Sequence, residues 1–75
     1  MRRSIMSLSE IINEVVMYSG RFPDQPNIEI FDFVEEVCGL RTNEESAVGR
    51  VIIAAYEDGT EAGFKEAKRW GLNVK

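Results

Sequence analysis

Histidine is absent from this 75-residue chain, and cysteine occurs only once, at Cys38. The lack of histidine removes the commonest general base and every nucleophile pair that depends on an imidazole. A single cysteine excludes a disulfide within the chain, and one thiolate cannot fill the four ligand positions of a structural zinc site. Cys38 ends a predicted helix, whose negative end disfavours a thiolate, so we expect a small buried or half-buried hydrophobe there. These absences predict a protein with no enzymatic activity, no cofactor and no bound metal.

Long hydrophobic runs are also missing. The longest apolar run covers residues 51–56, far short of the roughly 20 residues that a membrane span needs. The opening MRRSIMSLSE contains two arginines but lacks the apolar core of a secretion signal. Together with a lone reduced thiol, this pattern leads us to expect a cytoplasmic protein with no membrane contact.

Charge is distributed unevenly along the chain, whose net charge is −4. Residues 24–61 carry ten acids and two arginines, a net charge of −8, whereas the segments on either side are mildly basic. Such an acidic middle disfavours general nucleic-acid binding, which depends on neutralising phosphates. It favours contact with a basic surface of another protein.

Hydrophobic periodicity predicts one all-α domain, residues 1–75, built as a small bundle of four short helices. The first helix begins at a capping box formed by Ser7 and Glu10, and Gly20 is expected to end it near Ser19. A loop rich in proline and glycine follows at 19–27, with Phe22 as its anchor on the core.

The other three helices are expected at 27–38, at about 43–57 and at about 61–70. Thr42 and Glu45 have the spacing of a second capping box, and Gly71 predicts a Schellman end for the last helix. We expect residues 1–6 and 73–75 to fray. The predicted core consists of Leu8, Ile12, Val15, Phe33, Val34, Val37, Val48, Val51, Ile52, Ala55 and Phe64.

Residues 50–56 also fit a strand, which would make the fold α+β, because their β-branched side chains favour a sheet. A helix is favoured because the hairpin-like Asp58-Gly59 is followed by a helical pattern and not by a partner strand. A helix that is apolar on so many sides needs cover from several neighbours. We expect the loop around Phe22 to cover part of it, and residues 51–56 are also a candidate homodimer interface.

Acidic side chains on the second predicted helix form the main candidate binding surface. Glu29, Asp32 and Glu36 recur at i, i+3 and i+7 and therefore share a face. The chain has no calcium-binding loop and no glycine-rich phosphate loop, so these carboxylates predict a contact for a basic protein surface, or else a solvated face. The predicted partner-binding residues are Glu29, Asp32, Glu35 and Glu36, with Tyr56 or Trp70 as an aromatic anchor.

The function predicted from these features is a non-enzymatic protein–protein interaction module, a small acidic adaptor or inhibitor. Its size, charge and lack of catalytic groups are typical, by analogy, of inhibitors from phages and mobile elements. An array of carboxylates can imitate the charge of a nucleic-acid backbone, so the partner surface would include one that normally binds nucleic acid.

The basic segment FKEAKRWG, residues 64–71, supports an alternative function. Lys65, Lys68 and Arg69 could contact phosphates while Trp70 stacks on a base, as in a small dimeric nucleic-acid-binding regulator. Three cations are a small electrostatic footprint, and they can instead pair with acids of the same chain. We therefore expect a protein partner and not a nucleic acid.

Overall fold

The computed structural model of the protein describes residues 6–21 and 27–74. They form four helices: α1 (Leu8–Arg21), α2 (Asn27–Cys38), α3 (Ala47–Asp58) and α4 (Thr60–Arg69). These described residues contain no strand, so the all-α prediction is confirmed. The strand alternative for residues 50–56 is wrong, because the whole run lies inside α3.

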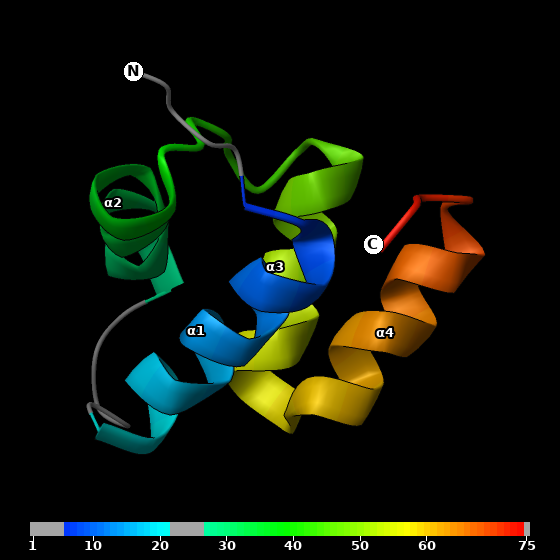
Figure 1. Cartoon of the computed structure of the whole chain (residues 1–75), viewed down its shortest axis with the longest axis horizontal. Helices are drawn as coiled ribbons and strands as arrows, with labels where there is room; N and C mark the ends of the chain where they lie inside the picture. Colours follow the sequence, from blue (N-terminus) through cyan, green and yellow to red (C-terminus); the bar gives the residue numbers. More distant parts are fainter. Residues whose placement is uncertain (1–5, 22–26, 75) are drawn as a thin grey trace.

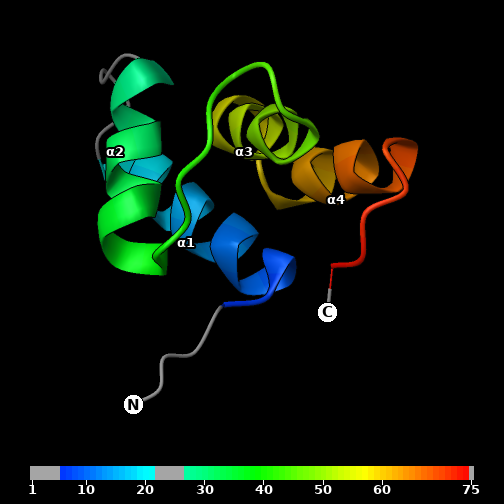
Figure 2. The same cartoon turned by 90° about the horizontal axis from the view of Figure 1, so that it is seen from above.

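Helices α1 and α3 pack against each other in the middle of the fold, with α2 on one side of the pair and α4 on the other (Figures 1 and 2). Both outer helices contact α1 and α3, and the described parts of α2 and α4 do not contact each other. The acidic segment on α2 and the basic segment on α4 therefore lie on opposite sides of the molecule.

The core lies where α1, α2 and α3 meet, and most of its members were predicted. The predicted residues that are buried are Leu8, Ile12, Val15, Val34, Val51, Ile52 and Ala55. Phe33, Val48 and Phe64 are partly buried against this cluster, and Ile11, Ile30, Cys38 and Ala67 complete it. Apolar cover of α3 thus comes from within the chain, as a central helix requires.

Val37 is the one predicted core residue that the structure places outside, since it is 50% exposed. Helix α2 has neighbours on one side only, so it buries a narrow line of residues four apart, namely Ile30, Val34 and Cys38. Val37 falls on the flank of that line. The prediction failed because sequence periodicity gives the direction of the buried face but not its width.

The capping box at the start of α1 is confirmed. The Ser7 N–H donates to Glu10 Oε1 at 3.0 Å, and the Glu10 N–H donates to Ser7 Oγ at 3.2 Å. The predicted end near Ser19 is wrong, because α1 continues to Arg21 and Gly20 has no positive φ. The rest of the predicted loop, including Phe22, lies outside the described residues.

Helix α3 starts later than predicted, at Ala47, because the polar turn before it is organised differently. Ser46 is the N-cap, and its Oγ accepts a hydrogen bond from the Gly49 N–H at 2.9 Å. Asn43 Oδ1 accepts from the Glu45 N–H at 2.9 Å, an Asx turn that competes with helix. Thr42 does not cap a helix; its hydroxyl instead hydrogen-bonds to the Ser46 hydroxyl.

The Schellman end of α4 is present. The Leu72 N–H donates to the Ala67 carbonyl at 2.9 Å and the Gly71 N–H donates to the Lys68 carbonyl at 3.1 Å, with Gly71 at φ +70°. The chain then turns back, and the Ser9 N–H donates to the Val74 carbonyl at 2.7 Å. Residues 73–74 are therefore tied to the start of α1, which differs from the fraying we expected. Met6 likewise packs against the core, whereas residues 1–5 lie outside the described part.

Candidate functional site

The most distinctive surface lies along the junction of α1 and α2. Among the described residues, Met17 on α1 is 59% exposed and Val37 on α2 is 50% exposed. Phe33, one helical turn before Val37, is partly buried, and its ring lies 4.4 Å from that of Tyr18 on α1, centroid to centroid. We call these four side chains, Met17, Tyr18, Phe33 and Val37, the apolar strip.

A shallow cavity of about 130 Å³ opens in the apolar strip, lined by Glu14, Met17, Tyr18, Arg21 and Phe33. The four α1 residues recur at i, i+3, i+4 and i+7, so one face of that helix supplies them. Phe33 closes the cavity from α2. The two helices thus leave room between them for a small apolar group.

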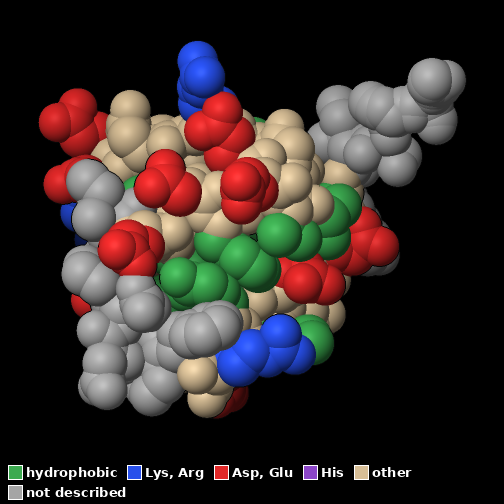
Figure 3. Space-filling view, turned by 90° about the vertical axis from the view of Figure 1, so that its left-hand side faces the viewer, with side chains coloured by type: hydrophobic (Ala, Val, Ile, Leu, Met, Phe, Trp, Pro, Cys, Tyr) green, Lys and Arg blue, Asp and Glu red, His purple; other side chains and the backbone are tan. Residues whose placement is uncertain are grey.

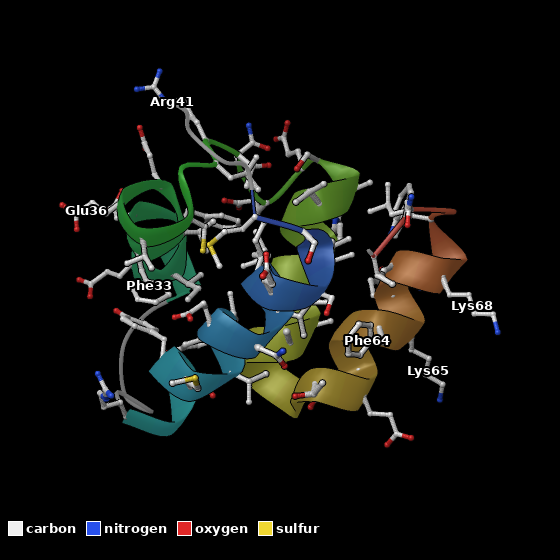
Figure 4. The ribbon with its side chains drawn as sticks, in the orientation of Figure 1. Phe33, Glu36, Arg41, Phe64, Lys65 and Lys68 are labelled. Atoms are coloured by element: carbon white, nitrogen blue, oxygen red, sulfur yellow. The ribbon has the colours of Figure 1, made fainter. Side chains whose placement is uncertain are left out.

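Three carboxylates border the strip. Glu29, Asp32 and Glu36, here called the acidic row, line a second depression together with Tyr18 and Phe33. Figure 3 shows this side of the molecule, with acidic side chains bordering a band of hydrophobic ones. In Figure 4, Glu36 points away from the body of the protein. The sequence-predicted grouping of these three acids on one face of α2 is therefore found in the structure.

Negative charge from the acidic row reaches the apolar strip. Burial and the nearby charge of Glu29 raise the pKa of Tyr18 above its ordinary value of 10.0, with further contributions from Tyr56 and Asp32. The Tyr56 ring lies 6.2 Å from the Tyr18 ring, centroid to centroid, and so supports the strip from α3. Tyr56 is partly buried against the core and contacts this surface through Tyr18.

The other predicted partner-binding residues lie apart from the apolar strip, although Glu35 lines a further depression with Asp32 and Glu36 of the acidic row. Glu35 forms an ion pair with Arg41 at 3.2 Å. Because successive helical residues turn by about 100°, Glu35 lies across α2 from Phe33 and Val37. Trp70, which is 48% exposed, is the C-cap of α4, the helix on the other side of the α1–α3 pair from α2 (Figure 2), and its Nε1–H donates to Glu66 Oε2 at 2.8 Å.

The basic residues of α4 form a weaker feature. Lys65 and Lys68 point away from the protein body in Figure 4. Arg69 lies 3.9 Å from Glu66, and Glu61 stands in the first turn of the same helix. Residues 60–69 therefore carry three cations and two acids, a net charge of +1. This is little charge for binding a phosphate backbone.

The segment proposed for homodimer contact is largely covered by its own chain. Val51, Ile52 and Ala55 are 0% exposed, whereas Ile53, Ala54 and Tyr56 are partly buried. Dimer formation through residues 51–56 stays a prediction. Any such contact would use the partly buried members of the segment.

The described part of the chain gives little support for a reactive thiol, a metal site or a membrane span. Cys38 is a buried free thiol, and burial together with the charge of Glu14 raises its pKa above 9.0. Residues 6–21 and 27–74 contain no group of three or more side chains suited to hold a metal ion. None of the helices formed by these residues has the length and hydropathy to cross a membrane.

Comparison with known proteins gives no family for this chain, since no family model, curated protein or solved structure matches it significantly. The site must therefore be judged on its own residues. Sequence reasoning missed the α1 half of it. The signal was present as Glu14, Met17, Tyr18 and Arg21, which share a helical face beside the buried one.

Proposed function

We propose that the protein is a non-enzymatic interaction module, an adaptor or inhibitor, that binds a basic surface of a partner protein through α1 and α2. One observation carries this proposal: the acidic row Glu29, Asp32 and Glu36 shares a depression with Tyr18 and Phe33 of the apolar strip, whose other members, Met17 and Val37, are half-exposed. Protein interfaces combine these two elements, an apolar centre and a polar rim.

The acidic row and the apolar strip would contribute to binding in different ways. Ion pairs between solvent-exposed groups contribute only about 0–1 kcal/mol each, so carboxylates alone give weak binding. Burial of Met17 and Val37 would add a hydrophobic contribution that is roughly proportional to the area covered. The carboxylates then speed encounter with a positively charged partner and select against an acidic one.

A cytoplasmic location belongs to the same proposal. The single thiol, Cys38, is buried and unpaired, as is usual for proteins of reducing compartments. A basic partner in that compartment is the expected target.

The proposal is tested by comparing two charge-reversed variants. Asp32→Lys with Glu36→Lys alters the acidic row, whereas Glu44→Lys with Glu45→Lys makes the same change in net charge at the exposed turn before α3. Each tagged protein is incubated with lysate of the source cells, and the bound proteins are quantified by mass spectrometry.

We expect basic proteins that bind the natural chain to be lost from the Asp32/Glu36 variant and kept by the Glu44/Glu45 variant. Circular dichroism should show that both variants remain helical, because all four positions are exposed. An equal loss in both variants would mean that only overall charge matters. That result, or no loss in either, contradicts the proposal.

A further inference from the structure

The shape of the α1–α2 surface indicates what kind of segment fits it. We infer that its occupant is an amphipathic helix of the partner that carries a basic flank and inserts one large apolar side chain between Met17, Tyr18 and Phe33. This inference rests on the proposed function and adds the conformation and chemistry of the bound segment.

The spacing of the acidic row favours a helix over an extended segment. Glu29, Asp32 and Glu36 rise along α2 in steps of about 4.5 and 6 Å, because a helix rises about 1.5 Å per residue. Lysines or arginines at i, i+3 and i+7 of a second helix have the same steps. Side chains on one face of an extended chain recur every ~6.8 Å and would fall out of step with the row.

An extended segment also lacks a backbone partner here. Binding by strand addition needs an exposed sheet edge, and the described residues form helices and no strand. A helix laid along α2, whose 12 residues span about 18 Å, needs only side-chain contacts. Its length would be about three turns.

Charge and cavity size define the chemistry of the occupant. The lining of the two depressions contains four carboxylates, Glu14, Glu29, Asp32 and Glu36, against the guanidinium of Arg21, a net charge of −3. Lysine or arginine must therefore flank the apolar residues of the bound helix. The cavity of about 130 Å³ is close to the ~150 Å³ of an engineered cavity that takes up benzene. It has room for one leucine- or phenylalanine-sized group.

The test uses two fluorescently labelled peptides of about 16 residues, long enough to form a helix in isolation. Both contain the same leucines, lysines and alanines. One places leucine at i, i+4 and i+7 with lysine on the flanks, and the other distributes leucine around the helix. Affinity is measured by fluorescence anisotropy, and the binding face is mapped by amide chemical shifts of the protein.

We expect the amphipathic peptide to bind about tenfold more tightly than the rearranged one and to shift resonances of α1 and α2. Met17→Gln with Val37→Gln should weaken it about tenfold, whereas Trp70→Gln should not. Trp70 is a matched control because its exposure, 48%, resembles that of Val37, yet it caps α4, which lies on the other side of the α1–α3 pair from α2.

Failure of this inference can be told apart from failure of the proposed function. Suppose that both peptides bind with equal affinity and that Asp32→Asn with Glu36→Gln abolishes the binding of both. This result overturns the helical occupant and leaves binding to a basic surface intact. Affinity that is unchanged by these two substitutions contradicts both. Absence of binding of the amphipathic peptide below about 1 mM overturns the inference.

Discussion

Replacement of Gly49 by alanine places a methyl group inside the turn that precedes α3. A Cβ at this position would lie 1.7 Å from the carbonyl oxygen of Asn43 and 2.7 Å from its carbonyl carbon. Both are backbone atoms, so no side-chain rotation relieves the overlap. The turn or the first turn of α3 must move.

The cost of that movement can be worked out from the contacts that it breaks. Overpacking of a dense site costs about 1–3 kcal/mol. Displacement of the turn also weakens the Ser46 cap, whose Oγ accepts from the Gly49 N–H at 2.9 Å, and loss of a cap costs about 1 kcal/mol. Alanine returns roughly 1 kcal/mol through its higher helix propensity. We therefore expect a net loss of about 2 kcal/mol, which lowers Tm by about 8–16 °C in a domain of this size.

Replacement of Gly20 by alanine should change the stability of the protein in the opposite direction. Gly20 lies inside α1, has no positive φ, and a Cβ there would meet nothing within 4 Å. Alanine should stabilise the protein by about 0.5–1 kcal/mol, which raises Tm by about 2–8 °C. The two variants thus differ in direction although the chemical change is identical.

Thermal unfolding followed by circular dichroism at 222 nm, together with urea unfolding, measures both effects. A Gly49→Ala variant with an unchanged or raised Tm would refute the close approach of residues 43–46 to α3. A Gly20→Ala variant with a lowered Tm would refute the continuation of α1 to Arg21.

Three further predictions follow from burial and pKa shifts. Two valines on α2 form a matched pair, since Val34 is 0% and Val37 is 50% exposed. In urea unfolding, Val34→Ala should lower the free energy of unfolding by about 2 kcal/mol and Val37→Ala by less than about 0.5 kcal/mol. Equal losses would contradict the position of α2. Burial raises the pKa of the Cys38 thiol, so iodoacetamide at about pH 8 should modify the folded protein at least about tenfold more slowly than the urea-unfolded protein; equal rates would contradict its burial. Because folding raises the pKa of Tyr18, its contribution to the free energy of unfolding is present below its ordinary pKa of 10.0 and is lost as the pH rises above that value. The urea midpoint should therefore fall between about pH 9 and 11, and it should fall less in Tyr18→Phe. An equal fall in both proteins would contradict the pKa shift.

The parts of the fold that follow from local chemistry could be predicted from the sequence. A capping box is decided by residues three apart, and a Schellman end by a glycine and the residue after it, so Ser7 with Glu10 and Gly71 with Leu72 were sufficient evidence. The buried residues of α1 and α3 followed from periodicity, because both helices have neighbours on more than one side.

Two kinds of feature could not be predicted: the choice between competing helix caps, and contacts between residues of different helices. Thr42 and Glu45 have the spacing of a capping box, but the Asx turn at Asn43 takes the Glu45 N–H that Thr42 would cap, and Ser46 caps the helix at the Gly49 N–H; spacing alone does not rank these arrangements. The exposure of Val37 depends on how far α1 and α3 reach around α2. The pairing of Tyr18 with Phe33 joins residues from different helices, so only the packing of α1 against α2 reveals it.

One face of α2 packs against the rest of the protein, and a different face is the one proposed to bind a partner. Ile30, Val34 and Cys38 hold the helix against α1 and α3. Since successive residues turn by about 100°, the acidic row lies roughly opposite this line, and Phe33 and Val37 lie between the two. Neutral substitutions in the row thus remove charge from water-exposed positions and leave the buried line unchanged. A variant of the row that loses binding but keeps its Tm has therefore lost a contact with a partner and not the position of α2.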